Sequence, residues 1–228
     1  MANPRGGVAD ATIDPERDSR GPRTGSAPAS DIALPISPLP WLRVVELGSG
    51  DAWVLQRFFE ANPAYFDAVF GEPAGAGAAR DEIRDLPPAG WSFTRRWLLG
   101  YAAHDGELAA VADVVSDLLV PDVWHIGLFI VATSRHGSGD AGVLYRGLES
   151  WAASHGARWL RLGVVQGNAR AERFWEAQGF VETRTRARVE MGRRTNTLRV
   201  MVKPLPGGTL DAYLAAVPRD RPEPADHR

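Results

Sequence analysis

Three apolar runs follow one another along residues 92–132 and limit the folds open to this chain. They cover residues 92–103, 107–119 and 123–132, and each has the composition of a β-strand. The sequence HDGE joins the first two runs and is typical of a hairpin turn. The runs therefore predict three consecutive antiparallel strands.

Helices and further strands flank these three runs. Before them, we expect a strand over residues 41–47 and helices that start at Asp51, follow Pro63 and cover residues 79–86. After them, the pattern predicts a helix over 141–155, a strand over 158–165, a helix over 169–178 and two strands that begin at Phe180 and Thr195. This order predicts an α/β fold, α+β by some schemes, in which a mixed, mostly antiparallel sheet of about seven strands carries helices on both faces.

The two ends of the chain lack the composition of a core. Residues 1–40 contain no Phe, Trp or Tyr, and most of the 17 prolines lie in the ends. We expect residues 1–40 to be a disordered leader, residues 41–205 to be the folded domain and residues 206–228 to be a tail with one short helix over 209–217. Six tryptophans are assigned to the core: Trp41, Trp53, Trp91, Trp97, Trp151 and Trp159.

Composition excludes several classes of function. The chain of 228 residues has 26 Lys and Arg against 28 Asp and Glu, so its net charge does not favour nucleic acid or an anionic membrane. It has no Cys, which excludes disulfides, thiolate nucleophiles and Cys-bound metals. No apolar stretch approaches the roughly 20 residues of a membrane helix, and the N-terminus lacks the apolar core of a signal peptide. We expect a cytoplasmic protein without a metal site and without a nucleic-acid or membrane partner.

A glycine-rich turn, GSGDAG at residues 137–142, follows the third run and opens a helix. It matches a dinucleotide-binding fingerprint. However, the strand over residues 158–165 is followed by Gln166 and Gly167, where a dinucleotide-binding unit needs an acidic residue. A P-loop is excluded because the chain's only lysine is Lys203. Glycines at a helix N-terminus still let the backbone approach a phosphate. The turn alone leaves open whether it binds a phosphate or only reverses the chain.

A second motif, NARAERFWEAQGF, occupies residues 168–180. At this spacing the two motifs together resemble those of the GNAT superfamily of acetyl-CoA-dependent N-acetyltransferases. The family's first signature, V-x-P-x-x-R-G-x-G-x-G/A, is matched at Val131, Gly137, Gly139 and Ala141. The second, N-x-x-A-x-x-F-Y-x-x-x-G-F, is matched everywhere except at the tyrosine, which is Trp175 here. The resemblance covers residues 41–205.

The resemblance implies a splayed pair of central strands that holds acetyl-CoA as co-substrate. The strand that ends near Val131 and the strand that ends near Val165 would part, and the pantetheine arm would lie between them. The residues implied to contact it are Phe129, Ile130 and Val131 in the strand, His136, Gly137, Ser138, Gly139, Ala141 and Gly142 in the phosphate loop, and Asn168 and Trp175 in the second motif.

Three positions depart from the family pattern. His136 stands where Arg or Gln is usual, although the neighbouring Arg135 is available to replace it. Asp140 replaces an aliphatic residue, and we expect its carboxylate to face solvent or to cap the helix. Trp175 replaces the tyrosine that in many members protonates the departing thiolate, and an indole N–H is not a usable general acid.

The implied reaction moves an acetyl group to an amine of a small molecule, peptide or protein by direct attack in a ternary complex. His125 is the first candidate base because it lies six residues before Val131, where strand alternation would place both on one face. Asp113 is the second, since burial in its apolar strand would raise its pKa. Tyr145 is a candidate acid for the thiolate. Each has a structural alternative: a packed histidine, a hydrogen-bonded strand residue and a core tyrosine.

The acceptor side is the least constrained part of the prediction. Family resemblance places it at Tyr65, Phe66 and residues 183–199. Arg184, Arg186 and Arg188 alternate along this last segment and either attract an anionic group or form a solvated strand face. A homodimer is compatible with the resemblance. The alternative function is a catalytically degenerate GNAT-like protein that binds an acyl-CoA or a protein partner without turnover.

Overall fold

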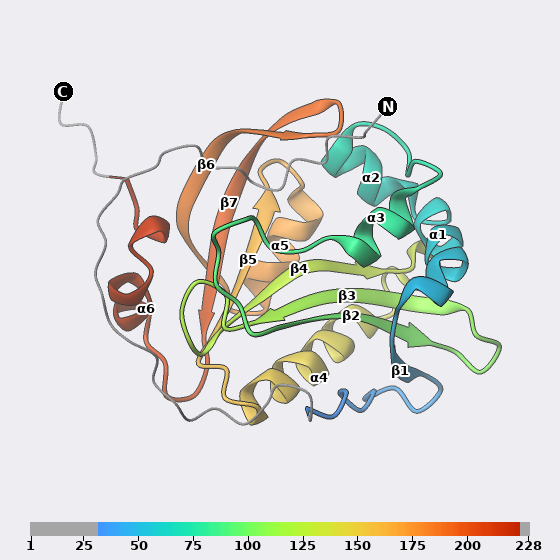
Figure 1. Ribbon diagram of the computed structural model, residues 1–228, viewed down its shortest axis with the longest axis horizontal. Coiled ribbons are helices and arrows are strands. Elements are labelled where there is room, and N and C mark those ends of the chain that lie inside the picture. The colour runs from blue at the N-terminus through green and yellow to red at the C-terminus, as the bar shows by residue number, and fades with distance from the viewer. Residues whose placement is uncertain (1–31, 224–228) are drawn as a thin grey trace.

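A computed structural model describes residues 32–223, in which seven strands form one sheet of order β1-β2-β3-β4-β5-β7-β6 (Figure 1). Within residues 32–223, β4 and β5 pair in parallel and the other neighbouring strands pair antiparallel. The strands are β1 (Arg43–Glu46), β2 (Arg95–Ala102), β3 (Leu108–Ser116), β4 (Val123–Val131), β5 (Trp159–Val165), β6 (Val181–Met191) and β7 (Arg194–Pro204). The helices are α1 (Ala52–Glu60), α2 (Pro63–Phe70), α3 (Ala78–Arg84), α4 (Asp140–Ser154), α5 (Ala169–Ala177) and α6 (Leu210–Ala216). The predicted fold class is confirmed.

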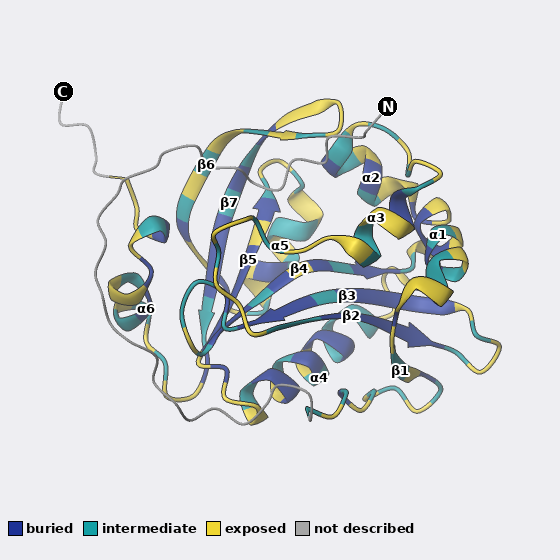
Figure 2. Cartoon of the chain, in the orientation of Figure 1, coloured by how far each residue is buried: buried dark blue, intermediate teal, exposed yellow. Residues whose placement is uncertain are grey.

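Side chains alternate between the two faces of the sheet, and each face has its own core. On one face, α4 and α5 cover residues of β2 such as Trp97 and Tyr101. On the other face, α1, α2 and α3 cover the alternate residue Leu98. Figure 2 shows the buried central strands between these two layers. Within residues 32–223, none of the helices has the length and apolar character needed to cross a membrane.

Tryptophans account for much of the core on the α4 face. Trp97 and Trp124 stack with ring centroids 5.3 Å apart, and Trp151 meets both edge-on at 5.1 Å. Trp159 is also buried, as expected. The core assignment is wrong for Trp53, which is 65% exposed because it points away from the buried face of α1. It is also wrong for Trp91, which is half-buried and packs against Arg219.

The residues just before β1 pack onto α4. Trp151 Nε1 donates a hydrogen bond to the Ala33 carbonyl at 2.8 Å. Pro38 lies against Gly147, where a Cβ atom would be only 3.0 Å from the proline ring. Residues 32–40 therefore pack with the domain, although the sequence placed them in a leader. The rest of that expected leader, residues 1–31, lies outside the described residues.

The segment after β7 also packs on the sheet. The helix expected over residues 209–217 is α6, and its Tyr213 is buried against Val123, Trp159 and Val202 from three different strands. The chain then continues to Asp220, which is fully buried. This part of the expected tail belongs to the packed domain because it supplies both apolar surface and a buried charge.

Asp220 is the centre of a buried ion-pair cluster. Its carboxylate accepts hydrogen bonds from Arg161 Nε and Nη2 at 2.7 and 3.2 Å, from Tyr213 Oη at 2.6 Å and from Arg186 Nη2 at 3.1 Å. Burial opposes ionisation of this group, but the Arg161 guanidinium and these hydrogen bonds outweigh it and hold the pKa of Asp220 well below its ordinary range. The carboxylate is therefore ionised at neutral pH.

The arginines of β6 bind the C-terminal segment. Arg184 Nη1 donates to the Arg219 carbonyl at 2.8 Å, and Arg186 contacts both that carbonyl and Asp220. Arg188 does not continue the alternation, because the strand bulges between Arg186 and Val189. The expected solvated face is therefore wrong for Arg184 and Arg186.

We predict that Asp220→Ala lowers the free energy of unfolding by about 3–5 kcal/mol, because it leaves the Arg161 guanidinium buried without its carboxylate. Urea denaturation at neutral pH measures the loss. The stabilisation is present above the ordinary carboxyl pKa of about 3.9 and is lost as the pH falls below it, so the difference between wild type and variant should shrink in acid. Glu223→Ala is the control: its pair with Arg184 is exposed, and a change within about 0.5 kcal/mol is expected. Equal effects of the two substitutions would contradict the assignment.

Candidate active site

The parallel strands β4 and β5 part in the middle of the sheet. Their pairing begins at Val123 with Trp159 and ends at Ile126 with Leu162. The next residue on each strand is a glycine, and both glycines are exposed. Because glycine has no side chain, the sheet has an opening at these two positions.

A bulge in β4 lies at this opening. Asp113 of β3 pairs with Leu128 and Val114 pairs with Ile126, so Gly127 has no partner across the ladder. An extra residue in a strand moves every later side chain to the other face. His125 therefore faces away from α4, whereas Val131 packs in the core beside α4. The expectation that these two residues share one face is wrong for this reason.

The glycine-rich turn connects β4 to α4 on one side of the opening. Gly137 and Gly139 adopt left-handed backbone conformations with φ of 87°, and neither has an atom within 4 Å of a Cβ position. The Ser138 hydroxyl donates to the Arg135 carbonyl and accepts from the Asp140 amide at 3.1 Å.

Three N–H groups of this turn fit a phosphate. Within the described residues, no hydrogen bond uses the backbone N–H groups of Gly137, Gly139 and Ala141. The Gly142 amide differs, since it donates to the Gly139 carbonyl. Unpartnered amides at the start of a fifteen-residue helix suit an anion, so the turn fits the pyrophosphate of a CoA thioester.

Charged side chains around the turn are paired with one another. His136 Nε2 lies 3.0 Å from the Val131 carbonyl, and Arg170 Nη1 lies 2.5 Å from His136 Nδ1. Arg135 stacks on the ring of Trp41 at 4.0 Å, and its Nη1 is 3.8 Å from an Asp140 carboxylate oxygen.

These contacts correct one expectation about the turn. Asp140 neither caps α4 nor faces solvent fully, because its carboxylate lies beside the Arg135 guanidinium and its side chain is 16% exposed. Arg170 contributes a positive charge here that the motif comparison did not single out.

The remaining residues expected to contact the co-substrate lie along the parted strands. Phe129 and Ile130 pair with β3 but have no partner on β5. The Phe129 ring stacks on Phe174 and packs against Trp175, which is buried. Asn168 begins α5, and its side-chain oxygen accepts from the Ala171 amide at 3.3 Å. Their roles toward a co-substrate stay predictions.

A pocket of ≈ 520 Å³ lies on the opposite face of the sheet. Its floor comes from β2, β3, β4, β5, β6 and β7 and includes both exposed glycines, Gly127 and Gly163. Its walls are α2, the segment from α3 to β2, and the tip of the β6–β7 hairpin. The hairpin tip is fixed to α2, since the Arg193 amide donates to the Phe70 carbonyl and Asn196 Nδ2 donates to the Val69 carbonyl, both at 2.8 Å.

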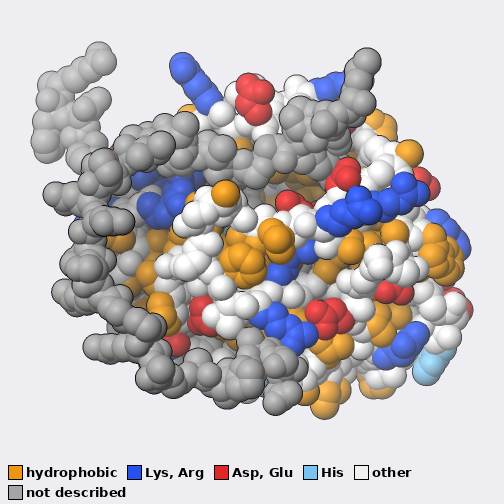
Figure 3. Space-filling model, in the orientation of Figure 1, with side chains coloured by type: hydrophobic (Ala, Val, Ile, Leu, Met, Phe, Trp, Pro, Cys, Tyr) orange, Lys and Arg blue, Asp and Glu red, His pale blue; other side chains and the backbone are white. Residues whose placement is uncertain are grey.

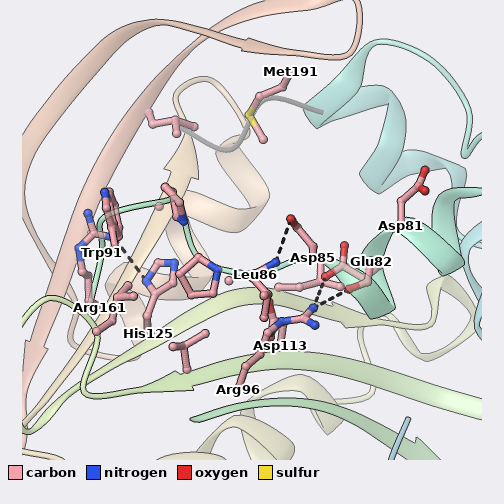
Figure 4. Close-up of a pocket in the computed structure, with 18 of the residues that line it drawn as sticks. Asp81, Glu82, Asp85, Leu86, Trp91, Arg96, Asp113, His125, Arg161 and Met191 are labelled. Atoms are coloured by element: carbon pink, nitrogen blue, oxygen red, sulfur yellow. Dashed lines mark hydrogen bonds and ion pairs between the residues drawn. The ribbon is translucent and has the colours of Figure 1, made fainter. Parts of the chain in front are cut away.

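Asp113 lies in this pocket at the bulge (Figure 4). A Cβ atom on Gly127 would be 2.8 Å from Asp113 Oδ2. Arg96 Nε lies 2.9 Å from the other carboxylate oxygen, and Arg96 Nη2 is paired with Glu82 at 3.3 Å. Burial raises the pKa of Asp113 to about 6, and Arg96 opposes this rise without cancelling it. The group therefore gains and loses a proton close to neutral pH.

The other two catalytic candidates occupy less suitable surroundings. His125 lies beside Arg161, and burial together with that positive charge lowers its pKa to about 3, so it is a weak base. Tyr145 is fully buried among Trp175, Phe174 and Phe180. Burial, and secondly Glu149, raise the pKa of Tyr145. The structure thus brings Asp113 and His125 into one pocket and places Tyr145 in the core on the other face.

The predicted acceptor residues are only partly in the pocket. Tyr65 lines it, whereas Phe66 is 2% exposed and belongs to the core. Within residues 183–199 the lining residues are Arg186, Glu190, Met191, Gly192 and Leu198. The segment from α3 to β2 contains no predicted site residue, although it lines the pocket with Asp81, Glu82, Arg84, Asp85, Leu86, Pro87, Pro88 and Trp91. Its paired prolines were the available signal of an irregular wall.

The two ends of the pocket differ in their charged groups. In Figure 4, Asp81, Glu82 and Asp85 lie at one end, and Trp91 and Arg161 lie at the other. The carboxylate end also holds Arg96, which pairs with Glu82 and Asp113. Figure 3 shows this face with acidic, basic and hydrophobic side chains interspersed. Within residues 32–223, no group of three His, Asp or Glu residues is placed to hold a metal ion.

We predict that Gly127→Ala lowers the free energy of unfolding by about 1–3 kcal/mol, because its methyl group collides with the Asp113 carboxylate. Gly163→Ala is the matched control across the opening: its nearest side-chain atom would be 3.9 Å away, and no such loss is expected. Thermal and urea denaturation of both variants measure the difference. Comparable stability of the two variants would contradict the close approach of Asp113 to the bulge.

Comparisons with known proteins agree with this arrangement. Residues 57–180 match the family model described as the acetyltransferase (GNAT) family. Similar solved structures include an acetyltransferase from Thermus thermophilus, with 23% identity, a TM-score of 0.56, and coverage of 72% of this chain and 97% of that one. A GCN5-related N-acetyltransferase from Kribbella flavida has 20% identity, a TM-score of 0.54 and coverage of 72% and 98%. The ribosomal-protein-S18-alanine N-acetyltransferase from Escherichia coli has 17% identity, a TM-score of 0.51 and coverage of 72% and 93%.

The search of curated proteins gave no match. Because the family model matches more than half of the chain and the fold agrees, this protein belongs to the GNAT acetyltransferase family.

Proposed function

We propose that this protein transfers an acetyl group from acetyl-CoA to an amine by direct attack in a ternary complex. One observation carries the proposal: the two glycines at the parting of β4 and β5 leave an opening between the glycine-rich turn on one face and a polar pocket on the other. A thioester held along the parted strands reaches the opening from one side. An amine in the pocket meets it from the other.

The chain's own groups suit the binding of acetyl-CoA, which supplies the activated acetyl group. The N–H groups of Gly137, Gly139 and Ala141 would hold the pyrophosphate, and Arg170 adds positive charge nearby. Beyond Ile126, the edge of β4 that faces away from β3 has no ladder partner, so it can pair with the pantetheine amides, although the Val131 carbonyl already contacts His136 Nε2.

Asp113 is the proposed general base. An ammonium group must lose a proton before its nitrogen attacks the thioester carbon, and a carboxylate at the opening accepts that proton. Attack forms the new C–N bond, the nitrogen then loses its second proton to solvent, the C–S bond breaks, and CoA leaves as the thiolate. Neither Trp175 nor the buried Tyr145 is placed to protonate it, so the proton comes from solvent. The products are the acetylated amine and free CoA.

The alternative, a GNAT-like protein that binds an acyl-CoA or a protein partner without turnover, is motivated by the departures from the family pattern at His136, Asp140 and Trp175. The two functions differ in one measurable respect. Both give stabilisation by acetyl-CoA, but only the enzyme releases CoA when an amine is added.

We predict that acetyl-CoA at about a hundred times its dissociation constant raises Tm by about 5 to 11 °C, the result of roughly 2.7 kcal/mol of binding linkage in a domain of this size. AMP and NAD at equal concentration are the controls and should give a smaller rise. Thiol release with a panel of primary amines is then followed with a thiol reagent. A rise in Tm without release from any amine favours the binding protein, and no rise rejects both functions.

We predict that kcat/KM for the amine falls below about pH 6, because protonated Asp113 accepts no proton and its pKa is about 6. Asp113→Asn should lower kcat by about a hundredfold or more and should remove this inflection. Glu107→Gln, an exposed change just before the same strand, is the control and should leave the pH profile intact. An unchanged profile in the Asp113 variant would show that another group is the base.

A further inference from the structure

His125 and Arg161 lie side by side on the pocket floor, paired in register between β4 and β5. Arg161 Nη1 is 3.4 Å from His125 Nδ1 (Figure 4). A guanidinium only donates hydrogen bonds, so Nδ1 is the acceptor in this contact. The ring is therefore the neutral tautomer that carries its proton on Nε2.

The orientation of Arg161 is fixed by the C-terminal segment. Its Nε and Nη2 atoms donate to both carboxylate oxygens of Asp220, and its side chain is 6% exposed. Tyr213 also donates to that carboxylate and holds it in place. Because Asp220 occupies this side of the guanidinium, Nη1 remains to contact His125. A residue after the last strand thus fixes the guanidinium that contacts His125 in the middle of the sheet.

The second nitrogen of His125 belongs to the pocket. The residue lines the pocket floor, and within residues 32–223 no side chain forms a hydrogen bond with Nε2, although the Arg161 backbone also interacts with the ring. The charged groups nearest to the ring are Arg161 and, behind it, Asp220. Burial and the Arg161 charge lower the pKa of His125 to about 3, so the ring stays neutral across physiological pH. An N–H group in such surroundings costs binding free energy when a ligand covers it without accepting its hydrogen bond.

The hydrogen bond from His125 could go to an oxygen of the amine substrate or to the thioester, and the position of His125 distinguishes the two. It precedes the bulge, on the part of β4 that is still paired with β5, and it faces the pocket rather than the α4 side. The register pair of His125 is Val115, two residues from Asp113 on the same face of β3. The N–H group therefore lies on the pocket face of the sheet, where the amine would bind, and not along the parted strands, where the thioester would lie.

This inference rests on the proposed function. We propose that His125 donates a hydrogen bond from Nε2 to an oxygen of the amine substrate, and that Arg161 and Asp220 hold the His125 ring in the orientation that this bond needs. The acceptor is then an amine with a carbonyl or carboxylate oxygen a few bonds away, as in an amino acid, an amino-acid amide or the N-terminus of a peptide. The ends of the pocket agree with this polarity. Carboxylates lie on the side that receives the ammonium group, and the Arg161 guanidinium lies on the side that receives the oxygen.

The tautomer is tested directly by ¹H–¹⁵N correlation spectra of the imidazole rings in the full chain. The chain has five histidines, and His125→Gln assigns the signal of interest. We expect the Nε2–H pattern without protonation between pH 5 and pH 8. A proton on Nδ1, or titration within this range, would overturn the inference. This readout does not depend on catalysis.

Substrate recognition is tested with a matched pair of amines, L-phenylalanine amide and 2-phenylethylamine, which lacks only the carboxamide. His125→Leu should lower kcat/KM for the amide about tenfold more than for the amine, mainly through KM, because one hydrogen bond is lost. His125→Gln keeps an N–H group near the position of Nε2 and should retain most of the preference. Equal losses for both amines, or identical behaviour of the two variants, would overturn the inference and assign His125 to the thioester or to packing.

The same pair separates this inference from the proposed function. If no amine is acetylated, the proposed transfer fails, and the spectra are repeated with each compound added. A shift of the His125 Nε2–H signal with the amide and not with the amine supports oxygen recognition without turnover. No shift with either compound overturns the inference.

Discussion

The bulge at Gly127 is the feature on which the arrangement of this site depends. Without the extra residue, β4 would present the same alternate residues to one face along its whole length. With it, His125 and Asp113 face the pocket while Phe129 and Val131 face the helices on the other side. The bulge also lies where β4 leaves β5, so the change of face and the opening of the sheet occur at one place. The two faces of the sheet are therefore connected at one point.

Charge in this pocket is controlled by burial and pairing more than by the number of ionisable groups. Burial raises the pKa of Asp113, so the ionised form costs folding free energy that grows as the pH rises from about 4 to about 6. Asp220 has the opposite balance, because the Arg161 guanidinium keeps it ionised despite complete burial. One carboxylate thus has a raised pKa and the other a lowered one, although both belong to the same residue type. The difference comes from their neighbours.

The sequence predicted the strands and helices because their apolar periodicity is local. The same local signals did not determine the ends of the domain: Pro38 packs on α4 and Tyr213 packs on the sheet, although their segments are rich in proline and polar residues. A glycine inside the apolar run over residues 123–132 was the available signal of the bulge. No local pattern indicated that Asp220 pairs with Arg161, since 59 positions separate them. Their pairing depends on the tertiary fold alone.

The late position of Asp220 has a consequence for how the molecule is made. A ribosome synthesises the chain from its N-terminus, so all seven strands emerge before the residue that neutralises Arg161. Until that residue arrives, β5 holds a guanidinium that cannot be buried without a large desolvation cost. The two ends of the pocket consequently fold at different times. The carboxylate end is complete when the hairpin of β2 and β3 has packed beneath α3, whereas the guanidinium end remains hydrated until the segment after α6 closes over it.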